Sequence, residues 1–234
     1  MVFDLTPLDF AALLWFLAAW AGYNLIGDRL APGRDSINRQ LLGLREAWMA
    51  RMLQRDNRIS DTALLGHTIH SASFFASTTM LVLAGLVGLL GAIDRGFSVI
   101  SDLTLAIKTT RLLVEFKVIL LIAIFVYAFF RFTWALRQYN YLCVLFGAAP
   151  LATQGDRHDG VAKQLATMLT LCIASFNGGL RSFYFAVAAM TWFIHPLLFM
   201  GATLWTIGVL VRRQYFSRTH RTITEAGFLL RPPN

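Results

Sequence analysis

Long runs of apolar residues, separated by short polar segments, organise this chain. A helix of roughly 20 residues crosses the hydrocarbon layer of a bilayer. Helices are also the way an open chain can cross, because unpaired backbone groups are costly in lipid. The pattern therefore predicts an all-α, polytopic transmembrane bundle within a single domain, residues 1–234. The predicted spans lie at about 8–28, 63–93, 114–137 and 182–211.

Two further segments show helical periodicity with a polar face. Over residues 36–54, Leu41, Leu44, Trp48 and Met52 share one face, which predicts an amphipathic helix on the cytoplasmic side. Over about 161–177, polar and apolar residues again recur on opposite faces. Asn177, Gly178 and Gly179 follow, and this triplet predicts a helix stop. We expect four spans plus this second amphipathic helix, and a fifth span over 164–180 is the alternative.

Charge sets the expected orientation. The first residues include Asp4 and Asp9 and no Lys or Arg, which does not suit a cleavable signal peptide, so we expect the N-terminus outside. The segment 29–58 then lies in the cytoplasm with seven Arg. Of 21 Lys and Arg, four spans place 12 inside and 9 outside, whereas five place 16 inside and 5 outside. The second distribution follows the positive-inside rule more closely, so both topologies stay open.

Composition excludes several classes of protein. Hydrophobic residues make up 56% of the chain and charged residues 15%, against about a quarter charged in ordinary soluble domains. A soluble enzyme, a disordered chain and a disulfide scaffold do not fit these values. The net charge of +8 lies between apolar runs. It therefore indicates attraction to the lipid bilayer and its anionic phospholipids rather than to nucleic acid.

Polar residues are predicted to collect near the cytoplasmic headgroup plane. They can form a collar of internal ion pairs or a clamp for phosphate or anionic lipid, since Arg favours planar, bidentate partners. Arg131 can reach the interface by extending along its helix, or it can face the bundle interior, within reach of an acid or a bound anion. We predict the interior position. The candidate binding residues are Arg51, Arg55, Asp56, Asn57, Arg58, Asp61, Arg131, Arg137, Asn140, Asn177 and Arg181.

Small residues form a ridge along the second predicted span. Such ridges let transmembrane helices approach closely. We expect helix packing within the monomer, with self-association into a homo-oligomer as the alternative. The ridge residues are Ser73, Ser77, Ala84, Gly88 and Ala92.

No cofactor, metal site or catalytic residue is predicted. A b-type haem needs two histidines at matching depths, and His67 and His70 do not match the depth expected of His195. No catalytic or nucleotide-binding motif occurs. We therefore expect a non-enzymatic scaffold or regulatory membrane component. The alternatives are a small transporter or channel for an anionic solute, and a protein or enzyme that binds lipid headgroups.

Several long motifs resemble one known family, the domain of unknown function 599 family of bacterial and plant membrane proteins. The resemblance spans nearly the whole chain. It implies a multi-helix protein of the bacterial inner (plasma) membrane, and it implies no activity. The motifs lie at Trp48–Asp61, Ser73–Thr79, Phe125–Tyr141, Gly147–Pro150 and Phe176–Ala186.

Overall fold

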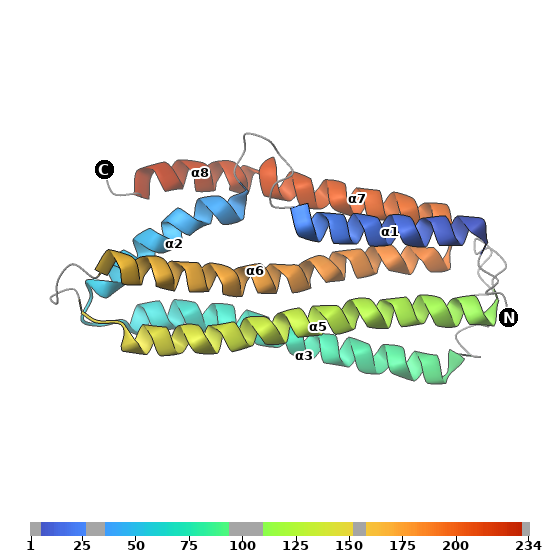
Figure 1. Ribbon diagram of the computed structural model, residues 1–234, viewed down its shortest axis with the longest axis horizontal. Coiled ribbons are helices and arrows are strands. Elements are labelled where there is room, and N and C mark those ends of the chain that lie inside the picture. The colour runs from blue at the N-terminus through green and yellow to red at the C-terminus, as the bar shows by residue number, and fades with distance from the viewer. Residues whose placement is uncertain (1–5, 27–35, 94–109, 152–157, 231–234) are drawn as a thin grey trace. The chain divides into compact units, whose positions relative to one another are not determined.

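The chain is helical throughout the part that the structure describes. The computed structural model describes residues 6–26, 36–93, 110–151 and 158–230 (Figure 1). No strand occurs in these ranges, so the all-α class is confirmed. The helices are α1 (Pro7–Ile26), α2 (Ile37–Leu53), α3 (Ile59–Gly91), α5 (Arg111–Ala148), α6 (His158–Met190), α7 (Pro196–Tyr215) and α8 (Arg218–Leu230), with a short 3₁₀ helix, η3, at Thr191–Phe193.

Three of these helices, α1, α3 and α5, are long and apolar enough to cross a membrane. They correspond to the first three predicted spans. α3 has 33 residues and α5 has 38, so at 1.5 Å per residue they are about 50 and 57 Å long. The hydrocarbon layer is about 30 Å thick. Both helices therefore carry residues well beyond the length that one crossing needs, and the total number of crossings stays a prediction.

The chain divides into two compact units. Unit 1 contains residues 1–27, 77–130 and 178–210, and unit 2 contains 28–76, 131–177 and 211–234. Three long helices, α3, α5 and α6, contribute one part to each unit.

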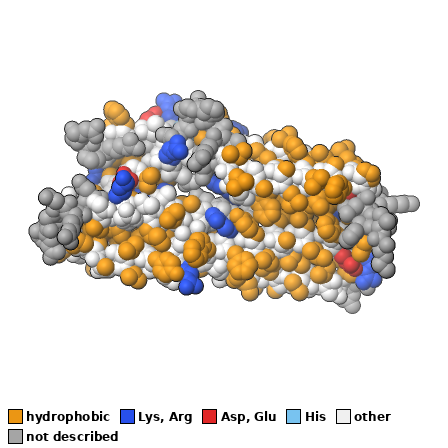
Figure 2. Space-filling model, viewed as in Figure 1, with side chains coloured by type: hydrophobic (Ala, Val, Ile, Leu, Met, Phe, Trp, Pro, Cys, Tyr) orange, Lys and Arg blue, Asp and Glu red, His pale blue; other side chains and the backbone are white. Residues whose placement is uncertain are grey.

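Aromatic side chains fill the core of unit 1. Phe16 of α1 is fully buried, and its ring lies 5.9 Å from that of Phe185 on α6 and 5.0 Å from that of Phe199 on α7. The outer surface of these helices is also apolar: Trp15 and Trp205 are both exposed, and Figure 2 shows hydrophobic side chains crowded over α1 and α7. A large apolar surface of this kind marks contact with lipid or another protein.

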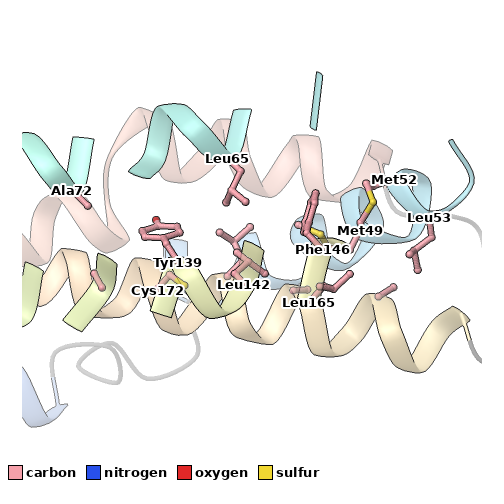
Figure 3. Close-up of a cluster of buried hydrophobic side chains, with 14 residues drawn as sticks. Met49, Met52, Leu53, Leu65, Ala72, Tyr139, Leu142, Phe146, Leu165 and Cys172 are labelled. Carbon is pink, nitrogen blue, oxygen red and sulfur yellow. The ribbon is translucent and has the colours of Figure 1, made fainter. Parts of the chain in front are cut away.

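Unit 2 has its own core, built from four helices (Figure 3). The predicted amphipathic helix near residues 36–54 forms as α2. Its buried Met49 and Met52 join a cluster with side chains from α3, α5 and α6. α8 packs along α2, and Thr224 Oγ1 of α8 donates a hydrogen bond to Gln40 Oε1. The cluster consists of Met49, Met52, Leu53, Leu65, Ala72, Ala135, Tyr139, Leu142, Phe146, Ala162, Leu165, Ala166, Leu169 and Cys172.

The predicted helix stop after residue 177 is wrong. The amphipathic segment forms as expected, but α6 continues without interruption through Gly178 and Gly179 to Met190. Both glycines are buried. A glycine inside a helix costs about 1 kcal/mol relative to alanine. Here the tertiary packing of a long helix outweighs that local preference, which the sequence pattern alone could not reveal.

The segment 182–211 does not form the single helix predicted for it. α6 ends at Met190, η3 follows, and α7 begins at Pro196. Proline lacks a backbone N–H, and it disfavours the helical conformation in the residue before it. Phe185 and Phe199 lie on either side of this break and both contact Phe16. The end of α6 and the start of α7 are therefore two antiparallel helical passes of unit 1 (Figure 1).

Candidate functional site

The predicted polar residues do not lie at one level along the helices. Within unit 2, α3 and the end of α5 run antiparallel: Arg58 contacts Ala149, and Phe75 stacks on Phe132 with ring centroids 5.6 Å apart. Arg131 is next to Phe132, so it lies level with Phe75. Phe75 is 14 residues beyond Asp61, which is about 21 Å along a helix. The candidate set therefore separates into several local sites.

Asp61 is the best-enclosed acid of this set. Its side chain is 1% exposed, and Oδ1 accepts hydrogen bonds from Trp48 Nε1 and from Arg55 Nη1, both at 2.7 Å. α2 ends at Leu53 and α3 begins at Ile59, so the short turn between them brings Trp48 over the first turn of α3. A carboxylate is favourable there because it faces the positive end of the helix dipole. Asp61 therefore ties α2 to α3.

Arg58 contacts the backbone at the C-terminal end of α5. Its Nη1 donates to the carbonyl of Ala149 and its Nη2 to that of Pro150, both at 2.8 Å. α5 ends at Ala148, so both carbonyls lie just beyond its last residue. A cation there suits the negative end of the helix dipole. Beside it, Asn57 accepts a hydrogen bond from the backbone of Ile59, and the side chain of Asp56 is exposed.

Arg131 is half-buried, and its Nη2 donates to the carbonyl of Ala174 on α6 at 3.0 Å. The side chain thus reaches the neighbouring helix, and its interior position stays a prediction. No carboxylate forms an ion pair with it among the residues that the structure describes. Its partner is a backbone carbonyl instead of the expected acid, and a bound anion stays a prediction.

The remaining candidates make separate local contacts. Arg51 donates to the carbonyl of Leu230, Arg137 donates to the phenol of Tyr141, and Asn140 is exposed. Asn177 donates to Asn38. Arg181 belongs to unit 1, where its guanidinium lies 5.5 Å from the ring centroid of Tyr23. The structure thus brings together Arg55 and Asp61, with Trp48 as a third member that the candidate set omitted.

The small-residue ridge is largely open. Ser73 is half-buried, whereas Ser77, Ala84, Gly88 and Ala92 are exposed. A Cβ atom added to Gly88 would meet nothing within 4 Å among the described atoms. Gly88 therefore has no close neighbour among the described atoms, and helix packing within the monomer stays a prediction for the ridge. Self-association through this surface stays a prediction.

The three histidines that were considered for haem have different local surroundings. His67 and His70 are exposed, and His195 Nδ1 accepts a hydrogen bond from the backbone N–H of Leu197 at 3.0 Å, where α7 begins. Across the described ranges, no group of three or more His, Cys, Asp or Glu residues could hold a metal ion.

A buried charged cluster in unit 1 was not among the candidates. Asp9 is 4% exposed and Lys117 is 5% exposed. Trp192 joins them: its Nε1 donates to Asp9 Oδ1 at 2.8 Å, and its carbonyl accepts from Lys117 Nζ, also at 2.8 Å. The ammonium also lies 5.3 Å from the centroid of the Trp192 ring, within the range of a cation–π contact.

The break before α7 explains why Trp192 needs this lysine. In a continuous helix the carbonyl of Trp192 would accept from the N–H of residue 196, but residue 196 is proline and has none. The ammonium of Lys117 supplies the missing donor. A proline four residues after a tryptophan, together with a lone lysine in an apolar run, was the sequence signal that could have suggested this contact.

Arg45 is a second buried cation outside the candidate set. It is 7% exposed and its Nη1 donates to Thr170 Oγ1 of α6 at 3.0 Å. Burial lowers the pKa of this guanidinium from its usual value, although arginine keeps its charge in proteins. Arg45 therefore ties the polar side of α2 to α6.

The chain was also compared with known proteins. The family model described as "Protein of unknown function, DUF599" matches residues 11–219. No curated protein and no solved structure matches the chain.

Asp61→Asn should lower the free energy of unfolding by about 1–3 kcal/mol, because it weakens the charge-assisted bonds to Trp48 and Arg55. Denaturation of the purified protein in detergent measures this effect. Asp56→Asn is the matched control: its side chain is exposed, and the expected change is within about 0.5 kcal/mol. Equal effects at the two positions would refute the tie between α2 and α3.

Lys117→Met should destabilise the protein by about 1–3 kcal/mol, because the carbonyl of Trp192 loses its donor. The same change should have a smaller effect in a Pro196→Ala background, where residue 196 regains an N–H for this carbonyl. A double-mutant cycle in denaturant measures the coupling. Strict additivity of the two changes would show that the lysine does not replace the missing backbone donor.

Proposed function

The chain belongs to the family of unknown function DUF599, and we propose that it is a non-enzymatic membrane scaffold that holds a cationic helical unit at the cytoplasmic face of the membrane. One observation supports this proposal: the buried charged side chains make hydrogen bonds that hold helices together. The buried Lys117 donates to a backbone carbonyl, and the buried Arg45 donates to the hydroxyl of Thr170. Asp9 and Asp61 accept from tryptophan side chains. Groups held in this way fasten helices together and do not converge on a reacting centre.

Five membrane crossings suit this architecture better than four. Unit 1 contains α1, parts of α3, α5 and α6, and most of α7. The cluster of Asp9, Lys117 and Trp192 joins the start of α1, the start of α5 and the turn between α6 and α7. We place these ends together on the outside of the membrane. Successive helices then cross in alternating directions, and the fifth crossing returns the C-terminal tail to the cytoplasm. That topology also gives the better positive-inside distribution: 16 basic residues lie in the cytoplasmic segments 29–58, 131–163 and 212–231, 4 lie in the outside segment 95–117, and Arg181 lies within α6.

The distribution of charge supports a cytoplasmic position for unit 2. Among its described side chains, twelve are Arg or Lys and four are Asp or Glu, an excess of eight positive charges. The described side chains of unit 1 include three basic and two acidic residues. A concentrated positive charge next to a bilayer attracts anionic lipid headgroups, at about 1 kcal/mol per Lys or Arg near the surface. Anionic phospholipids of the inner (plasma) membrane are therefore the expected partners of unit 2.

Cysteine labelling in spheroplasts tests this topology. In a background with Cys143→Ser and Cys172→Ala, a membrane-impermeant maleimide added outside should label Thr6→Cys and should not label Arg218→Cys. Both residues are exposed in the structure. Permeabilisation should make position 218 reactive, which controls for accessibility. Labelling of position 218 in sealed spheroplasts would exclude five crossings with the N-terminus outside.

Proteoliposomes test the absence of transport and catalysis. Reconstituted protein should neither accelerate the efflux of chloride or phosphate nor release headgroups from phosphatidylglycerol. Anionic vesicles should raise its melting temperature relative to phosphatidylcholine vesicles, and this difference should shrink as the salt concentration rises, because salt screens surface charges. Anion flux above that of protein-free vesicles would contradict the scaffold proposal in favour of a transporter. Lipid turnover above that level would favour an enzyme.

A further inference from the structure

A cavity of about 410 Å³ lies within unit 2, between the first half of α3 and the end of α5. Its walls are mainly apolar and include Leu65, Ile69 and Phe146. The volume falls within the range of about 300–1,000 Å³ that is usual for small-molecule sites. It is at the lower end of that range, which suits one hydrocarbon chain better than the two chains of a phospholipid.

Two glycines keep this cavity open. Gly66 of α3 and Gly147 of α5 both line it, and a Cβ atom added to either would meet nothing within 4 Å among the described atoms. Glycine is otherwise unfavourable inside a helix, by roughly 0.5–1 kcal/mol relative to alanine. The two positions therefore leave room at a cost in helix stability, and we expect larger side chains there to occupy the cavity.

Arg58 brings a positive charge to one end of the cavity. A guanidinium has five N–H donors. The carbonyls of Ala149 and Pro150 take one from each Nη atom, and Nε is covered by protein atoms. One N–H on each Nη remains. No ion pair involves Arg58 in the described part of the chain, so its charge is not neutralised by a carboxylate.

The apolar wall extends away from this charge in one direction. The lining residues from this part of the chain run from Arg58, which directly precedes α3, to Ile69 of α3. Eleven residues separate these two positions, which corresponds to about 16 Å of helix. The site thus has a cationic end and an elongated apolar body.

We propose that this cavity binds a single-chain fatty carboxylate, with its carboxylate at Arg58 and its chain directed towards Ile69. The charge selects an anionic head, and the volume admits one chain. Arginine suits this role because its planar guanidinium can hold a carboxylate through parallel hydrogen bonds. Binding here does not depend on the proposed scaffold function or on the number of membrane crossings.

Protection of Cys143 from alkylation provides the readout. Cys143 is exposed and lines the cavity, whereas Cys172 is buried. The probe is laurate, added to the full chain in phosphatidylcholine nanodiscs, and mass spectrometry follows the alkylation. At a laurate concentration tenfold above its Kd, simple occupancy should slow the alkylation of Cys143 about tenfold. Dodecanol, with the same chain and no charge, should protect much less.

Three variants test the two ends of the site. Arg58→Gln should weaken protection by laurate about tenfold and leave the weak effect of dodecanol unchanged, because a hydrogen bond to a charged group is lost. Gly66→Leu should abolish protection by both compounds, and Gly147→Leu should do the same from the opposite wall. Gly85→Leu is the matched control: it lies on α3 outside the cavity, with nothing within 4 Å of an added Cβ, and it should behave as the native protein.

These outcomes decide the proposal. Protection by laurate that persists in Gly66→Leu and Gly147→Leu would come from partition into the lipid and would overturn it. Equal protection of the native protein by laurate and dodecanol would overturn the role of Arg58, and no protection by laurate would refute the site. A cooperative melting transition in each variant establishes that it is folded.

Discussion

Backbone carbonyls that lose their helical N–H partner constrain this structure more than any other groups. In apolar surroundings such a carbonyl must find another donor, since an unsatisfied buried polar group costs several kcal/mol. The carbonyl of Trp192 loses its donor to Pro196 and accepts from Lys117. Just beyond the end of α5, the carbonyls of Ala149 and Pro150 lie outside the helical ladder and accept from Arg58. The reversal between α6 and α7 depends on the first of these contacts.

Charged residues that satisfy such carbonyls are of two kinds. Some have their charge balanced by a nearby opposite charge, and others do not. Lys117 and Asp9 are enclosed in unit 1 and linked through Trp192, so their charges are balanced locally. Arg58 caps α5 with two of its five N–H groups but has no carboxylate partner among the described residues. One residue can thus hold a helix end and still attract an anion. Unit 2 as a whole also carries an excess of positive charge at its surface, and anionic lipid headgroups can neutralise this charge.

The sequence predicted what depends on local periodicity and composition. The apolar runs gave α1, α3 and α5, and the amphipathic pattern gave α2. It could not show that α6 continues through Gly178 and Gly179, because their packing partners are distant in sequence. It also could not show the depth of Arg131 relative to Asp61, since that depends on the register of α5 against α3. Asp61 was a candidate binding residue, and that role stays a prediction; its observed partner Trp48 comes from the predicted apolar face of the preceding helix.

Solid-state NMR on the full chain in lipid bilayers tests the central contact directly. The chain has six Trp and three Lys, so labelling the Trp carbonyls with ¹³C and the Lys Nζ atoms with ¹⁵N leaves few pairs to distinguish. Lys117 Nζ lies 2.8 Å from the Trp192 carbonyl oxygen. The account predicts strong dipolar dephasing of one Trp carbonyl signal by ¹⁵N, which disappears in Lys117→Met. Absence of dephasing in the native protein, or dephasing that persists in Lys117→Met, would contradict it.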